Sequence, residues 1–276
     1  MSEHTIAFIG GGNMARSLIG GMIADGFAPE RIRVADPDAG NRDSLGTAFG
    51  VRTMADNTTA AAGADAVVLA VKPQVMAGVA AEIGPQAAAD GAVVLSIAAG
   101  IREQDLSRWL AHDLPVIRAM PNTPSLLQSG ATALYANARV TEAQRQLATA
   151  MLDAVGLTCW LDDEALMDAV TAVSGSGPAY FFYLMELIAD SGERLGLPRE
   201  TARQLSLQTA LGAARMALDS DEDPAALRRR VMSPGGTTEQ AISTLTDGGL
   251  PELVDRAVNA AATRAAELGD DLGRQD

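Results

Sequence analysis

The sequence is poor in several residue types, and each shortage excludes a class of protein. Only one of its 276 residues is a cysteine, so no disulfide can form within the chain. That residue, Cys159, has apolar neighbours, and we expect a buried thiol on a strand. The two histidines, His4 and His112, are far apart and belong to no Cys/His cluster, so we expect no metal site.

Positive charge is also scarce. The chain has 21 Lys and Arg residues against 35 Asp and Glu residues, a formal net charge of −14, which argues against nucleic-acid and anionic-membrane partners. It has no apolar run near the roughly 18 residues that a membrane helix needs. We find no signal-peptide pattern either, and we therefore expect a cytoplasmic protein without membrane contact.

The residues that are present indicate two domains. Up to residue 162, apolar strands alternate with helices, and from Asp163 on only helices follow. Continuous apolar runs such as Asp65–Val71 and Ala92–Ile97 are typical of parallel strands that are covered on both faces. We therefore expect an α/β domain over 1–162 with a parallel-rich sheet, and an all-α domain over 163–276.

A glycine-rich turn follows the first strand. The apolar run Ile6–Ile9 ends in three glycines and passes into a helical pattern, as Gly10-x-Gly12-x-x-Ala15, a dinucleotide fingerprint. Gly10 would permit the sharp turn, Gly12 would let the backbone approach a pyrophosphate, and Ala15 would pack the helix against the strand. The alternative is a glycine-rich turn that binds nothing. We expect the whole turn to bind the cofactor: Gly10, Gly11, Gly12, Asn13, Met14 and Ala15.

Asp36 follows the second strand, where a dinucleotide fold meets the adenosine ribose. Its carboxylate would either accept the ribose 2′-hydroxyl, which favours NAD, or form an Asx turn before Pro37. Arg42 offers a third reading, as a contact for the adenine ring or a 2′-phosphate. The sequence leaves the choice open.

Three further strand ends place candidate residues at the same edge of the sheet. Lys72 brings a cation there, as a cofactor contact or as a solvated lysine. The small residues from Ala98 to Gly100 leave room for a flat ring. Asn122, between two prolines, would pair with a nicotinamide carboxamide or form an Asx turn. The cofactor candidates from these strand ends are Val71, Lys72, Pro73, Ala98, Ala99, Gly100 and Asn122.

Two features characterise the helical half. The helix expected over Ala179–Leu195 is apolar almost all round at its start, which indicates cover by a partner subunit. Thr237 and Gln240 fit a capping box, so we expect a helix to begin there. Its free N–H groups favour an anion such as a substrate carboxylate, while the alternative is a capped helix without ligand.

Six motifs follow one another along the chain: FIGGGNMA, VKP, VVLSIAAG, RAMPNTP, AVSGSGPAYFF and SPGGTTEQAI. In this order they resemble the pyrroline-5-carboxylate reductase family, and the resemblance runs from Ile6 to beyond Leu250. It implies a Rossmann-type domain followed by an all-α dimerisation domain. It also implies NAD(P)H-dependent reduction of Δ1-pyrroline-5-carboxylate to L-proline, the last step of proline biosynthesis, by a homodimer or an oligomer of dimers.

The resemblance also assigns roles. It implies that Lys72 and Pro73 line the ribose and nicotinamide side of the cofactor, with Asn57 near the adenosine half. It implies that Thr238 faces the substrate ring nitrogen and is the catalytic residue. The implied substrate-binding residues are Ser233, Gly236, Thr237 and Thr238. We expect NADP(H) as the favoured cofactor, with NAD(H) tolerated and no metal.

The nearest rival is a β-hydroxyacid dehydrogenase. That family is similar around Gly175-x-Gly177, but it expects a catalytic lysine and an asparagine where this chain has Phe181 and Met185. Ketone reduction creates an alkoxide that needs a proton, whereas a protonated cyclic imine accepts hydride without forming an anion. The missing acid therefore favours C=N reduction. Reduction of another cyclic imine, and a non-catalytic nucleotide-binding regulator, are the remaining alternatives.

Overall fold

The computed structural model describes residues 4–274, which form two compact units. One unit comprises the residues up to Ser176 together with those from Ala260 on, and the other comprises Gly177–Asn259. The boundary expected between 162 and 163 differs from this contact-based division, which groups residues 163–176 and the end of the last helix with the sheet.

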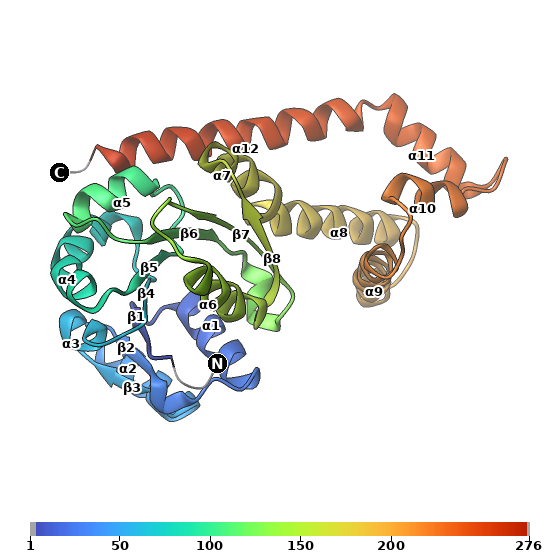
Figure 1. Cartoon of the computed structure of the whole chain (residues 1–276). Coiled ribbons are helices and arrows are strands. Elements are labelled where there is room, and N and C mark those ends of the chain that lie inside the picture. The colour runs from blue at the N-terminus through green and yellow to red at the C-terminus, as the bar shows by residue number, and fades with distance from the viewer. Residues whose placement is uncertain (1–3, 275–276) are drawn as a thin grey trace. The chain divides into compact units, whose positions relative to one another are not determined.

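The first unit contains an eight-stranded sheet in the order β3-β2-β1-β4-β5-β6-β7-β8 (Figure 1). Strands β1 to β6 are parallel, β7 is antiparallel to β6, and β8 is parallel to β7. This confirms the α/β class with a parallel-rich sheet. The strands are β1 (Ile6–Ile9), β2 (Ile32–Ala35), β3 (Arg52–Met54), β4 (Ala66–Leu69), β5 (Val93–Ser96), β6 (Val116–Met120), β7 (Gly130–Ala136) and β8 (Gly156–Leu161).

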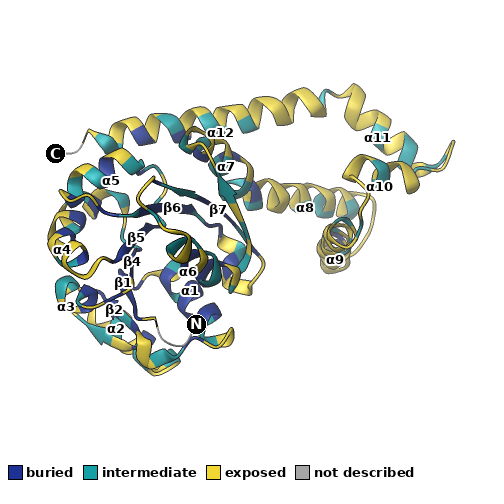
Figure 2. Cartoon of the chain, in the orientation of Figure 1, coloured by how far each residue is buried: buried dark blue, intermediate teal, exposed yellow. Residues whose placement is uncertain are grey.

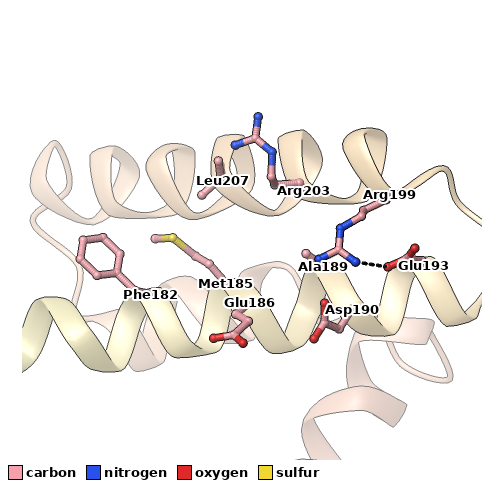
Figure 3. A pocket seen from close by; sticks show the side chains of 9 residues that line it. All are labelled: Phe182, Met185, Glu186, Ala189, Asp190, Glu193, Arg199, Arg203 and Leu207. Atoms are coloured by element: carbon pink, nitrogen blue, oxygen red, sulfur yellow. Dashed lines mark hydrogen bonds and ion pairs between the residues drawn. The ribbon is translucent and has the colours of Figure 1, made fainter.

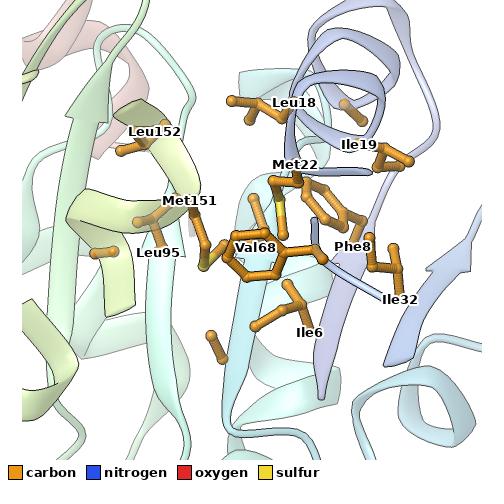
Figure 4. Packing of buried hydrophobic residues seen from close by; sticks show 14 of the residues in the cluster. Ile6, Phe8, Leu18, Ile19, Met22, Ile32, Val68, Leu95, Met151 and Leu152 are labelled. Carbon is orange, nitrogen blue, oxygen red and sulfur yellow. The ribbon is translucent and has the colours of Figure 1, made fainter. Parts of the chain in front are cut away.

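Apolar side chains on both faces of the central strands explain this arrangement. Alternate residues of β1 point to opposite faces, so Ile6 and Phe8 enter one core while Ala7 and Ile9 enter the other. Figure 4 shows the first core, in which Met22 and Met151 from two helices meet the strands. All four residues of β1 are fully buried, so the loop that follows β1 starts from a strand packed in the core.

Helices and short helical turns connect the strands and cover the sheet. The helices α3, α4 and α5 supply one core, while α1, α2 and α6 supply the other. These elements are α1 (Asn13–Ala24), η1 (Pro29–Arg31), α2 (Ala39–Phe49), α3 (Asn57–Ala61), η2 (Pro73–Val75), α4 (Met76–Asp90), α5 (Glu103–Leu110), η3 (Thr123–Leu127), α6 (Glu142–Asp153), η4 (Glu164–Leu166), α7 (Met167–Val170) and the π-helical η5 (Thr171–Gly175).

The C-terminal turns of α12 (Leu250–Gly273) pack on α5 within the first unit. Arg102 forms an ion pair with Asp270 at 2.7 Å, and Arg108 donates to the carbonyl oxygen of Gly273 at 2.6 Å. The C-terminal turns of α12 are therefore tied to the helix that follows β5.

The second unit contains helices and has little core of its own. Its elements are α8 (Gly177–Arg194), α9 (Arg199–Leu218), α10 (Pro224–Arg230), α11 (Thr237–Asp247) and the first turns of α12. Most of its helical surface is exposed (Figure 2). On α8, Phe181, Phe182 and Tyr183 are each more than 60 % exposed. Large apolar side chains gathered in this way mark an interaction surface.

One sequence expectation, the buried thiol, can be compared directly with the fold. Cys159 is exposed in this chain, so the expected buried thiol is wrong for the chain by itself. Among residues 4–274, no helix is both long and apolar enough to cross a membrane.

Candidate active site

The glycine turn lies between β1 and α1 at the carboxyl edge of the sheet. Gly10 has φ +102°, and a Cβ there would lie 2.7 Å from the carbonyl oxygen of Ala70, so only glycine fits without a shift. Its N–H donates to the carbonyl oxygen of Ala35 at 2.8 Å. The sharp turn that the sequence predicts at Gly10 is therefore present.

The turn also has the features that a dinucleotide requires. Gly12 is the N-cap of α1 and is exposed, and a Cβ on it would meet open space. No side chain caps this helix, so its first N–H groups are free for an anion. The residues present therefore fit a pyrophosphate.

Asp36 is buried beneath this turn, and both of its carboxylate oxygens accept hydrogen bonds from the protein backbone. One carboxylate oxygen accepts the N–H of Gly11 at 2.7 Å, and the other accepts the N–H of Asp38 at 2.8 Å. The second bond is an Asx turn, so that reading of the sequence describes the local geometry. The first bond holds the glycine turn on the end of β2, a positioning role that the sequence did not reveal.

Two arginines make contacts around α2, the helix that follows β2. The Arg42 guanidinium donates to the carbonyl oxygens of Asp36 and Pro37, at 2.7 and 2.9 Å. Arg16 on α1 donates to the Ser44 hydroxyl at 2.5 Å. Arg42 thus places positive charge at the end of β2, where the adenosine ribose of a dinucleotide is met.

The other candidate cofactor residues lie in the same unit. Lys72 is exposed at the start of η2, just beyond β4. Ala98, Ala99 and Gly100 follow β5, and Gly100 has φ +76°. The Asn57 side chain donates to Glu82 at 2.8 Å at the beginning of α3.

Asn122 is buried at the end of β6. Its amide nitrogen donates to the carbonyl oxygen of Ser174 at 3.0 Å, and its amide oxygen accepts the N–H of Ala131 at 2.9 Å. The side chain therefore joins the loop to β7 and to the π-helical turn, which differs from an Asx turn. A further contact with a nicotinamide stays a prediction.

A polar cluster near these loops was missed by the sequence analysis. Arg118 on β6 forms a largely buried ion pair with Glu164, which also accepts the N–H of Glu103 at 2.7 Å. Burial raises the pKa of the nearby Tyr135, and the negative charges of Glu164 and Glu103 raise it further. The cluster fixes the start of α5, three residues beyond Gly100. Its members are far apart in sequence, so no local pattern could have revealed it.

The candidate substrate loop lies in the second unit, before α11. Gly236 is the N-cap and no side chain caps the helix, so the capping box expected for Thr237 and Gln240 is wrong. Instead, the Glu239 carboxylate reaches back to accept the N–H of Gly235 at 2.7 Å. This contact stabilises the turn, in which Gly235 has φ +70°. The N–H groups of Thr237 and Thr238 are left at the helix start.

A separate pocket of about 310 Å³ lies between α8 and α9 (Figure 3). Its walls are apolar at Phe182, Met185 and Leu207, and charged toward Glu193 and Arg199. It contains none of the residues that the sequence predicts for the site. In the described part of the chain, no three His, Cys, Asp or Glu residues are grouped to hold a metal ion.

An exposed glycine turn before an uncapped helix, at the carboxyl edge of a parallel sheet, defines a nucleotide-binding protein of the Rossmann class. Comparison with protein families agrees for this part of the chain. Residues 5–100 match the model described as NADP oxidoreductase, coenzyme F420-dependent. Residues 164–268 match the model described as pyrroline-5-carboxylate reductase dimerisation.

Known relatives extend the match to the whole chain. It is 54 % identical to a pyrroline-5-carboxylate reductase of Pseudomonas aeruginosa, over 99 % of this chain and 100 % of the relative. The structure of a pyrroline-5-carboxylate reductase from Coxiella burnetii is 45 % identical, with a TM-score of 0.93, covering 96 % of this chain and 98 % of the other. A Plasmodium falciparum pyrroline carboxylate reductase with NADP bound is 28 % identical, with a TM-score of 0.86, covering 98 % and 99 %. The chain belongs to the pyrroline-5-carboxylate reductase family, which excludes the β-hydroxyacid dehydrogenase alternative.

Proposed function

We propose that this protein reduces Δ1-pyrroline-5-carboxylate to L-proline with NADPH, as a homodimer, in the last step of proline biosynthesis. The observation that carries the proposal is the exposed, uncapped turn at Gly12, within a chain 54 % identical to a reductase of that name. Mixing the protein with the imine and NADPH, and measuring both NADPH oxidation and proline, tests it. A cytoplasmic location and an oligomer of dimers stay predictions.

The cofactor turn and the strand ends would hold the dinucleotide. The N–H groups that open α1 bind the pyrophosphate, because the Gly12 backbone is accessible there. Ala98 and Ala99 leave space for the nicotinamide, with Asn122 and Lys72 at the neighbouring strand ends and Asn57 toward the adenosine side. When bound, the nicotinamide supplies the hydride.

The start of α11 would bind the substrate carboxylate. The N–H groups of Thr237 and Thr238 point out of the helix start, whereas Gly235 and Gly236 already donate to Glu239 and Ser233. The Ser233 hydroxyl adds a further donor. The carboxylate then sets the orientation of the imine ring.

The Thr238 hydroxyl would bind the ring nitrogen. It makes no hydrogen bond to another residue in the described chain, whereas Thr244 on the same helix donates to the carbonyl oxygen of Gln240 at 2.8 Å. A protonated imine accepts hydride at its ring carbon without creating an anion. Thr238 therefore needs only to hold the nitrogen, and no general acid is required.

Replacing Thr238 by alanine should cost about 1–3 kcal/mol of transition-state stabilisation, a fall of roughly 5- to 150-fold in kcat/KM. Thr238→Ser keeps the hydroxyl and should retain most of the wild-type kcat/KM. Thr244→Ala is the matched control and should leave kcat/KM near the wild-type value. Equal kcat/KM for the Thr238→Ala and Thr244→Ala variants would show that the Thr238 hydroxyl takes no part in the reaction.

We infer that NADPH is preferred over NADH. Both carboxylate oxygens of the buried Asp36 accept backbone N–H groups, those of Gly11 and Asp38, and the Arg42 guanidinium brings positive charge beside them. Arg42→Ala should therefore lower kcat/KM with NADPH about tenfold, the effect of one charge-assisted hydrogen bond. The value with NADH reports any damage to the loop and should change little. A parallel fall with both cofactors would show that Arg42 only supports the turn.

A further inference from the structure

The segment Ala98–Gly100, beside which the nicotinamide is proposed to bind, has few hydrogen bonds of its own. The N–H of Ala98 donates to the Ser96 hydroxyl at 3.4 Å, which is long for a hydrogen bond. Within residues 4–274, the N–H groups of Ala99 and Gly100 donate no hydrogen bond. Ala99 is exposed, and Gly100 has φ +76°. The position of this segment therefore depends on what packs against it.

The C-terminal turns of α12 supply that packing within the first unit. A Cβ at Gly100 would lie 2.9 Å from Cδ1 of Leu272, so this leucine lies directly against the glycine. Leu272 and Ala98 also pack on the same core, the one that contains the buried Ile101. Leu272 therefore contacts the last residue of the segment and the core on which its first residue rests.

Arg102, two residues after Gly100, ties the segment to the same helix. Its guanidinium forms an ion pair with Asp270 at 2.7 Å and donates to the carbonyl oxygen of Ala266 at 3.3 Å. A Cβ at the buried Gly269 would lie 3.2 Å from the Arg102 Nε, so the small residue lets the helix backbone come close to the guanidinium. Because the contacts come from two successive turns, Arg102 is held by the helix itself and not by one side chain.

We propose that Leu272 and Arg102 are positioning residues, through which the C-terminal turns of α12 hold the segment Ala98–Gly100 in place for the nicotinamide ring. The inference rests on the NADPH-dependent reduction proposed above. Hydride transfer depends on where the ring lies, since a misplacement of about 1 Å can lower a rate about 100-fold. The pyrophosphate turn at Gly12 follows a different strand, so its binding of phosphate should not depend on these two side chains.

Leu272→Ala removes the contact with Gly100 and should lower kcat about tenfold, because the ring is less well placed. The primary deuterium isotope effect on kcat should rise as the chemical step becomes slower. This variant should bind NADPH about fivefold more weakly, yet bind 2′-phospho-ADP-ribose, which lacks the nicotinamide, as the wild type does. Leu272→Met, which keeps a long apolar side chain, should retain most of kcat.

Arg102→Ala tests the second contact, at a side chain that is 32 % exposed, so this chain should fold. It should show the same pattern of slower turnover, weaker NADPH binding and unchanged binding of 2′-phospho-ADP-ribose. Arg108→Ala is the matched control, because Arg108 donates to the Gly273 carbonyl oxygen of the same helix but lies in the last turn of α5, away from the segment. The control should leave kcat and both affinities near the wild-type values.

A merely structural role would give different results. A variant that is only less stable would bind both nucleotides more weakly by the same factor and keep the wild-type isotope effect, which would overturn the proposal. Wild-type kcat and NADPH affinity in Leu272→Ala and Arg102→Ala would overturn it too, as would equal losses in Arg108→Ala. A wild-type protein that binds NADPH without reducing the imine would reject the proposed reaction instead, and the two affinities would still decide the role of α12.

Discussion

A Gly12→Val chain should fold normally and bind NADPH at least about 100-fold more weakly than wild type, a loss of about 3 kcal/mol. Gly12 has φ −70°, which valine tolerates, and a Cβ there meets open space, so neither strain nor a clash opposes folding. The added side chain occupies the space through which the pyrophosphate approaches the N–H groups of α1. Titration of NADPH fluorescence, with thermal unfolding as the check on folding, measures both effects.

Gly78→Val is the matched control. Gly78 lies on α4, and a Cβ there also meets open space, so the same side chain is added to the same domain away from the turn. The control should bind NADPH as the wild type does. Equal affinity of both variants would show that the Gly12 backbone does not approach the cofactor.

Glu164→Ala should lower the free energy of unfolding by about 3–5 kcal/mol, because it leaves the Arg118 charge buried without a partner. The Arg118 side chain is only 10 % exposed, and Glu164 also accepts the N–H of Glu103, so two interactions disappear together. Urea unfolding followed by circular dichroism measures the loss.

Two controls separate this effect from the loss of any ion pair. Asp113→Ala removes the partner of Arg139, a pair in which Asp113 is 89 % exposed, and should cost at most about 1 kcal/mol. Combining Glu164→Ala with Arg118→Met should recover part of the stability, since no unpaired charge then remains buried. A Glu164→Ala chain as stable as Asp113→Ala would mean that Arg118 is hydrated in the folded protein.

The sequence predicted the parts of the fold and site that local patterns determine. The apolar runs Ile6–Ile9, Asp65–Val71 and Ala92–Ile97 contain the strands β1, β4 and β5. The Gly10 turn follows from a conformation that only glycine adopts readily, so its position could be predicted from residue type alone.

The remaining errors and gaps depend on contacts between distant residues. Asp36 was ambiguous because the direction of its carboxylate depends on Gly11, which lies 25 positions away. The capping box failed because Glu239 binds Gly235 and Gly236 takes the N-cap position. No helix was assigned over Met76–Asp90, where Pro85 within the segment argues against one. The antiparallel direction of β7 depends on its pairing with β6, from Ile117 with Ala136 to Met120 with Ala133, which an apolar run alone does not specify.

The central claim is hydride transfer from the nicotinamide to the C=N carbon of Δ1-pyrroline-5-carboxylate. NADPH carrying deuterium in its transferable position, turned over with the unlabelled imine, tests it by mass spectrometry of the product. The account predicts proline with one deuterium. The label lies on the ring carbon that is bonded to nitrogen and does not bear the carboxylate. Unlabelled proline, or no proline from a protein that binds both NADPH and the imine, would contradict it.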